Sequence, residues 1–249
     1  MAKYTFKSQF ATEFEFISAK NGRPTVLYLH GFCSDCWGRK PETVKSFCAR
    51  AGCGFLRFEY AGHGSDKENF EKADFAIWKN QVLELIDDVI AGDVICVGSS
   101  LGGWLALLAA AERPRRVKAV VGLAAAPNFI TRFAGKMSDA QKQELQQTGK
   151  TCFGGADFTY TITARFVQTA MENLLDENAP WPIDCKLRLL QGTMDKYVDW
   201  RLAPAIAEKV TGSDCIVHLI KGADHRLNDD VSARLLQATL SELTGGDLL

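Results

Sequence analysis

Short apolar runs alternate along the chain with longer segments in which apolar residues recur every three or four positions. The runs have the length of buried strands, and we expect strands at 25–30, 54–60, 93–98, 117–125, 187–191 and 216–220. The periodic segments predict helices at 38–52, 75–91, 101–112, 201–210 and 228–243. Strands that alternate with helices of this length form βαβ units, so the pattern predicts an α/β fold: a mostly parallel central sheet with helices on both faces.

Two parts of the chain depart from this alternation. Residues 1–20 alternate apolar and polar positions, which predicts two strands at an antiparallel edge of the sheet. Residues 127–182 interrupt the βαβ pattern with predicted helices at 138–148 and 163–176, separated by a polar, turn-rich stretch at 149–161. We expect this helical excursion to be a small lid inserted in one domain that spans residues 1–249.

Composition excludes several classes of protein. The 29 Lys and Arg residues balance 30 Asp and Glu residues, so the chain lacks the basic excess typical of nucleic-acid binding. No apolar run reaches the ~18 residues of a membrane span, and we expect no stable membrane insertion. The eight cysteines lack paired zinc-ligand spacing, so we expect reduced thiols and neither a metal nor a cofactor.

The strongest chemical signal is Gly98-Ser99-Ser100-Leu101-Gly102, a GxSxG between a predicted strand and a predicted helix. A strand, a sharp turn and a helix around this pattern indicate a nucleophile elbow, which would make Ser100 the nucleophile. The alternative is an ordinary βα turn with a capping serine. A serine hydroxyl is a weak nucleophile without a neighbouring base, so the hypothesis requires a histidine.

The order of residues along the chain selects that histidine. In folds with a nucleophile elbow the base follows the nucleophile and the acid, which excludes His30 and His63. Of the two that follow Ser100, His218 lies inside an apolar strand, whereas His225 lies in a loop after the last strand. We therefore expect His225 to be the general base.

The acid should follow the strand before last. Asp195 lies in the loop after 187–191, where its carboxylate would hold the Nδ1–H group of His225. Asp199 starts the next helix and fits a capping role, Asp224 is expected to be solvated, and Asp184 precedes the strand at the wrong edge of the sheet.

An acyl-transfer site also needs two backbone donors for the developing negative charge on the substrate oxygen. The amide of Leu101, the residue after the proposed nucleophile, supplies one. The second donor should lie in the loop after strand 25–30, and His30-Gly31-Phe32 makes the Phe32 amide the expected donor.

The ordered set His30-Gly31-Phe32, Gly98 to Gly102, Asp195 and His225 resembles the α/β-hydrolase superfamily over nearly the whole chain. A closer resemblance is to the abhydrolase-domain group of palmitoyl-protein thioesterases. It rests on the runs Phe58 to Ser65, Val97 to Trp104, Leu187 to Gly192 and Asp224 to Arg226. One departure is His30-Gly31-Phe32, where this family often has Pro-Gly-Tyr; the change alters pocket polarity but keeps the backbone donors.

The resemblance implies a serine esterase or acyl thioesterase that needs no cofactor. Animal members of the group are mitochondrial depalmitoylases that also hydrolyse acyl glucuronides. This chain shows no mitochondrial presequence, so we expect the cytoplasmic location of bacterial relatives, and a mitochondrial one only for a eukaryotic source.

Our hypothesis is hydrolysis of a small acyl ester, an acyl thioester or an acylated protein through an acyl-Ser100 intermediate, by a monomer or homodimer. The acyl chain would lie against aromatic residues near the lid: Trp37, Trp104, Phe129, Phe133 and Phe166. Two alternatives stay open. The same residues serve peptidases, lactonases and carbon–carbon bond hydrolases, and a non-catalytic binding protein can use a hydrolase scaffold.

Overall fold

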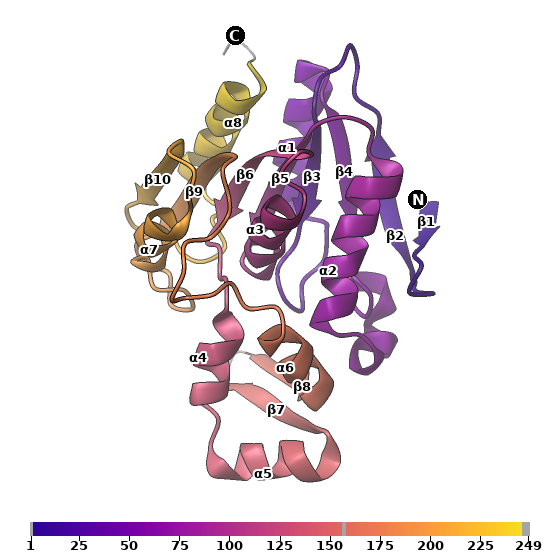
Figure 1. The fold of residues 1–249 in the computed structure, drawn as a ribbon, viewed down its shortest axis with the longest axis vertical. Helices are drawn as coiled ribbons and strands as arrows, with labels where there is room; N and C mark the ends of the chain where they lie inside the picture. Colours follow the sequence, from indigo (N-terminus) through magenta and orange to yellow (C-terminus); the bar gives the residue numbers. More distant parts are fainter. Residues whose placement is uncertain (1, 156–157, 246–249) are drawn as a thin grey trace.

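The computed structural model describes residues 2–155 and 158–245, which are built around an eight-stranded sheet (Figure 1). The order across the sheet is β1-β2-β4-β3-β5-β6-β9-β10. β1 pairs with β2, and β2 with β4, in antiparallel fashion; the other neighbours are parallel. The bounds are β1 (Ala2–Thr5), β2 (Ala11–Ile17), β3 (Thr25–Leu29), β4 (Gly54–Phe58), β5 (Val94–Ser99), β6 (Val117–Leu123), β9 (Lys186–Gly192) and β10 (Cys215–Ile220).

Side chains alternate between two cores, one on each face of the sheet. In β3, Leu27 and Leu29 face the core beneath α2 (Phe75–Glu84), α3 (Leu101–Glu112) and α7 (Leu202–Lys209). Val26 and Tyr28 face the opposite core, beneath α1 (Arg39–Ala51) and α8 (Asp230–Thr244), which pack against each other. The predicted α/β architecture, with helices on both faces and an antiparallel edge, is confirmed.

Two short helical segments extend this pattern. The helix expected at 75–91 is α2 followed by a π-helical turn, η2 (Leu85–Val89). A 3₁₀ segment that the sequence did not indicate, η1 (Gly64–Lys72), follows β4. Among the described helices, none is long and apolar enough to cross a membrane.

The segment between β6 and β9 leaves the carboxyl end of β6 and extends away from the sheet (Figure 1). It contains α4 (Phe129–Gly135), α5 (Asp139–Thr148), β7 (Lys150–Gly155), β8 (Phe158–Thr163) and α6 (Ala164–Met171). Helices were expected at the places of α5 and α6. The prediction of a turn-rich stretch at 149–161 is wrong for 150–155 and 158–161, because β7 and β8 pair as antiparallel strands that bury Thr151 against Ile162. Residues 156–157 of that stretch lie outside the described residues.

Candidate active site

Ser100 lies on a strained turn between β5 and α3. Its φ of 54° and ψ of −114° are uncommon for a residue with a side chain and cost on the order of 1–3 kcal/mol. Backbone hydrogen bonds hold the turn: the Ser100 amide donates to the Leu123 carbonyl (2.9 Å), and the Ser100 carbonyl accepts from the Gly103 (2.9 Å) and Ala126 (3.1 Å) amides. The strain is therefore maintained by β6 and by the start of α3.

The two outer glycines of the GxSxG pattern make this turn possible. A Cβ atom on Gly98 would lie 2.2 Å from the carbonyl oxygen of Gly102, and one on Gly102 would lie 2.2 Å from that of Leu29. The elbow thus packs directly on the end of β3. The same packing brings the loop after β3 close, since a Cβ atom on Gly31 would lie 3.5 Å from Ser100 Cβ.

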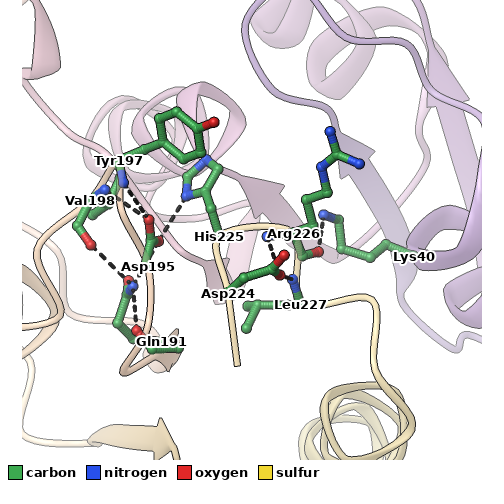
Figure 2. Close-up of polar contacts among 10 residues, drawn as sticks. Lys40, Gln191, Asp195, Tyr197, Val198, Asp224, His225, Arg226 and Leu227 are labelled. Atoms are coloured by element: carbon green, nitrogen blue, oxygen red, sulfur yellow. Dashed lines mark hydrogen bonds and ion pairs between the residues drawn. The ribbon is translucent and has the colours of Figure 1, made fainter. Parts of the chain in front are cut away.

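Asp195 and His225 are in direct contact at the carboxyl ends of β9 and β10 (Figure 2). His225 Nδ1 lies 2.8 Å from Asp195 Oδ2, which also accepts from Gln191 Nε2 at 2.9 Å. The other carboxylate oxygen accepts from the amides of Tyr197 (2.8 Å) and Val198 (2.9 Å). The four donors fix this carboxylate, and with it the orientation of the His225 ring.

Burial and hydrogen bonding act on Asp195 in opposite directions. The Asp195 side chain has no exposed surface, while the His225 side chain is 21% exposed. Burial raises the pKa of Asp195, but hydrogen bonds from His225 and from the Val198 and Tyr197 amides outweigh it and lower that pKa below its ordinary value. An ionised Asp195 suits the role of orienting a histidine and stabilising its protonated form.

Ser100 and His225 line the same cavity, which has a volume of about 1060 Å³. Among the described residues, no hydrogen bond joins the Ser100 hydroxyl to the His225 ring. Catalytic hydrogen bonds are often long without substrate and tighten in the complex. The structure thus brings Asp195 onto His225, and brings Ser100 to the cavity that His225 faces.

The two expected oxyanion donors lie beside Ser100. Leu101 begins α3, and Phe32 lies in the loop after β3 on the cavity wall. Neither backbone amide donates to another group within residues 2–155 and 158–245, so both are available to a bound substrate. The buried His30 anchors this loop: its Nδ1 lies 2.8 Å from the Gly31 carbonyl, and its Nε2 accepts from the Tyr60 amide at 3.3 Å.

The remaining histidines are unsuited to proton transfer at this cavity. Burial lowers the pKa of His30 to about 4 and that of His63 to about 3, so both rings are neutral near pH 7. His218 lies half-buried on the edge strand β10. Among the described residues, the histidine that lines the cavity is His225.

Three of the five aromatic residues expected to contact substrate line the cavity: Trp37, Phe129 and Phe133. Trp104 and Phe166 lie behind that wall, because both are almost completely buried. The Trp104 ring packs 5.9 Å from Phe129, and the Phe166 ring stacks 5.2 Å from Phe32. The expectation of direct contact with substrate is therefore corrected for Trp104 and Phe166, which support the residues that form the wall.

Besides Phe32, five further aromatic residues line the cavity that the sequence did not indicate as substrate contacts: Tyr28, Phe153, Tyr160, Tyr197 and Trp200. Tyr197 and Trp200 lie just after Asp195, so their place in the same loop was the available signal. Phe153 and Tyr160 belong to the unexpected hairpin and face each other across it.

Comparison with known proteins decides the family. The profile of the alpha/beta hydrolase family matches residues 26–246. The chain belongs to the alpha/beta hydrolase family. The hydrolase is 34% identical over 228 residues to the rat mitochondrial palmitoyl-protein thioesterase ABHD10, a match that covers 90% of this chain and 76% of the relative. The human protein of that name is also 34% identical, with 90% and 74% covered.

Solved structures agree with this assignment. Alpha/beta hydrolase domain-containing protein 10 from mouse superposes on the hydrolase with a TM-score of 0.87 at 30% identity, over 97% of each chain. A protein from Agrobacterium vitis superposes with a TM-score of 0.88 at 24% identity, over 97% of this chain and 98% of that one, which supports the fold. The resemblance inferred from the sequence motifs is confirmed.

In the described part of the chain, no cluster of three or more His, Cys, Asp or Glu side chains is arranged to hold a metal ion. The eight cysteines are free, and most are buried or half-buried.

Proposed function

We propose that this hydrolase cleaves acyl thioesters or carboxylic esters through an acyl-Ser100 intermediate, with His225 as general base and Asp195 as its partner. The observation that carries the proposal is the Asp195–His225 contact on the cavity that also contains Ser100 in a strained elbow. The family supplies hydrolysis as the type of reaction.

In the first half of the reaction, His225 Nε2 takes the proton of Ser100 as its Oγ attacks the acyl carbonyl carbon. The Phe32 and Leu101 amides donate to the carbonyl oxygen, which becomes negatively charged. The carbon–sulfur or carbon–oxygen bond then breaks, and the protonated His225 returns the proton to the departing thiolate or alkoxide. The acyl group stays on Ser100.

In the second half, water replaces the leaving group. His225 takes a proton from the water, whose oxygen attacks the acyl-Ser100 carbonyl, and the same two amides hold the oxyanion. The bond to Ser100 Oγ breaks, Oγ regains a proton from His225, and the carboxylic acid leaves. Each half returns His225 to its neutral state.

The cavity suits an acyl chain on one side. Phe32, Phe129 and Phe133 form an aromatic wall, and the segment 127–182 supplies two of them. We propose that this segment is the lid of a single domain. Relatives of this hydrolase are named palmitoyl-protein thioesterases, so a small acyl thioester or an acylated protein is the proposed substrate. Free thiols fit a reducing compartment, and we propose the cytoplasm.

The decisive experiment compares Ser100→Ala with Ser99→Ala. Ser99 is the neighbouring serine, but it belongs to β5 and is buried. We expect Ser100→Ala to lose labelling by a fluorophosphonate and to lose at least about 10⁴-fold in kcat on p-nitrophenyl esters and acyl thioesters. Ser99→Ala should keep both. Persistent labelling of Ser100→Ala would remove Ser100 from the mechanism.

The same assay separates the competing functions. Wild-type protein is offered esters, thioesters, a peptide amide, a lactone and a carbon–carbon bond substrate at equal concentration. Faster turnover of any of the last three would replace the proposed reaction. If the fluorophosphonate does not label the wild-type protein and none of the substrates is turned over, the protein would be a binding protein on the same scaffold.

A further inference from the structure

Positive charge is concentrated around the cavity. Seven of its lining residues are cationic: Arg39, Lys40, Arg132, Lys136, Lys196, Arg201 and Arg226. Three are carboxylates: Asp35, Asp195 and Asp199. The cavity therefore has an excess of four positive charges in a chain whose net charge is −1. Such a concentration in a concave site raises the local concentration of anions.

Some of these cations serve the fold. Arg39 forms an ion pair with Asp230 at the start of α8, and Arg201 lies 3.3 Å from Asp199. Lys40 donates to the backbone carbonyl of Arg226 at 2.6 Å (Figure 2). Arg226 follows His225 in the chain. These contacts account for three of the seven.

The other four, Arg132, Lys136, Lys196 and Arg226, are exposed. Within residues 2–155 and 158–245, none has a carboxylate oxygen within 4 Å. Scattered solvated cations are ordinary on a protein surface. These four are grouped on one cavity, with few acids to balance them, and so are available to a ligand.

Two of the four exposed cations neighbour the proposed catalytic pair, and two belong to the segment that contributes the aromatic wall. Lys196 directly follows Asp195 and Arg226 directly follows His225, so these two lie beside the proposed catalytic pair. Arg132 and Lys136 come from α4 and its end, in the segment that contributes the aromatic wall. An acyl group on the half-buried aromatic wall would leave the other end of the substrate toward these exposed cations.

We propose that the mouth of this cavity is a subsite for a leaving group with several negative charges, a phosphate-bearing thiol such as coenzyme A. The proposal rests on the function proposed above. Several separated Lys and Arg side chains match several phosphates, because each phosphate accepts charge-assisted hydrogen bonds from its own cation. A single carboxylate would engage only one or two of them.

The test uses a pair of substrates with the same acyl group and the same thioester. Butyryl-coenzyme A carries phosphates, and butyryl-pantetheine carries none. At low ionic strength we expect kcat/KM to be at least about 10-fold higher for the coenzyme A thioester, and the ratio to fall toward one near 1 M salt. Butyryl glucuronide, with one carboxylate, should show a much weaker dependence on salt.

Charge removal locates the subsite. The Lys196→Gln, Arg226→Gln double variant should lower the ratio of the two kcat/KM values by about 5-fold, whatever its absolute activity. Arg132→Gln with Lys136→Gln should lower the ratio as well. Arg115→Gln is the matched control, because Arg115 is exposed in the turn before β6, at the opposite edge of the sheet, and should leave the ratio unchanged.

Equal kcat/KM for the two thioesters at low salt, or a ratio unaffected by both double variants, would overturn the subsite while leaving thioester hydrolysis intact. An equally strong salt dependence for the glucuronide would overturn the preference for several phosphates. If neither thioester nor the glucuronide is cleaved, the proposed function fails, and the subsite with it.

Discussion

The hydrogen bonds around Asp195 restrict which side chains can replace it. Four donors surround its carboxylate, and its side chain has no contact with solvent. The two amides come from its own loop, the Gln191 donor comes from β9, and the fourth donor is the His225 ring. Any substitute therefore has to match four hydrogen bonds in a fixed geometry.

Asp195→Asn tests this arrangement. The amide keeps the size of the side chain but presents an NH₂ group to two of its four donors, and it has no charge to stabilise a protonated His225. We expect kcat to fall by about 10⁴-fold, since the histidine would be held in the wrong tautomer. Steady-state kinetics on a p-nitrophenyl ester measures the effect.

The control is Asp199→Asn, four residues further along the same loop, where the side chain is exposed and bonds to Arg201. It should retain nearly full activity and an unchanged circular dichroism spectrum. If Asp195→Asn were as active as this control, Asp195 would have a structural role, and the partner of His225 would have to be sought elsewhere.

At this scale, residue types and their order along the chain were enough to predict where the three proposed catalytic residues lie. Ser100, Asp195 and His225 follow three parallel strands, so their loops meet at one edge of the sheet. The pocket wall was harder to predict, because whether an aromatic side chain faces a cavity depends on packing. Trp104 and Phe166 pack behind the wall, while Phe153 and Tyr160 lie on it.

At the scale of elements, the βαβ core was predictable and the insertion only partly so. Each core strand is buried by neighbours on both faces, which forces a continuous apolar run. The hairpin β7–β8 has one buried face, and its second strand alternates polar and apolar residues from Thr159 to Thr163. Its glycines and polar residues obscured that alternation in the sequence. Its conformation depends on tertiary packing, chiefly against α5 and α6.

Asn128 joins the two ends of this insertion. Its Nδ2 donates to the Leu175 carbonyl at 2.7 Å, and its Oδ1 accepts from the Leu175 amide at 2.9 Å, in a buried site. The backbone at Asn128 is left-handed, with φ of 54°, a conformation that asparagine tolerates better than most residues. One side chain thus fastens residue 128 to residue 175.

Asn128→Ala should loosen the insertion. It leaves the buried Leu175 amide and carbonyl without partners, at a cost of about 2 kcal/mol or more. We expect hydrogen exchange of amides in α4 and α6 to become faster than in wild type, while amides in β5 keep their protection. Asn178→Ala is the matched control, since Asn178 is exposed in the same segment. Equal exchange in both variants would mean that other contacts hold the insertion.

At the scale of the whole molecule, the sequence reports a balance of charge and the structure reports its distribution. The chain has a net charge of −1, whereas the residues that line the cavity have four excess positive charges. The remaining residues therefore have a net negative charge. Composition alone showed no basic excess of the kind typical of nucleic-acid binding. It could not show the segregation, because the seven cations come from four separate parts of the chain.

Two neutral histidines couple the stability of the whole fold to pH. The rings of His30 and His63 form a buried cluster with the Tyr60 ring, with centroids 3.9 and 5.5 Å from that of Tyr60 and 5.2 Å from each other. Burial lowers the pKa of His30 to about 4 and of His63 to about 3 in the folded protein. In the unfolded chain both should titrate near the ordinary value of about 6.5. Between these limits the unfolded state binds more protons than the folded state, so stability falls as the pH falls.

The expected change in the free energy of unfolding with pH is large enough to measure. Between pH 7 and pH 5 the free energy of unfolding should decrease by up to about 2 kcal/mol for each of the two histidines. Urea unfolding at half-unit intervals gives the slope. This window lies above the ordinary pKa range of carboxylates, so the histidines dominate it.

His63→Phe isolates one of them. Phenylalanine fills a similar planar volume, and His63 Nε2 has no hydrogen-bond partner among the described residues, so only the contact of Nδ1 with the Ala61 carbonyl is lost. We expect the slope between pH 7 and pH 5 to fall by about half, because one of the two proton-binding differences is gone. A His63→Phe slope equal to that of wild type would show that His63 binds protons equally in both states, and that the acid sensitivity arises elsewhere in the fold.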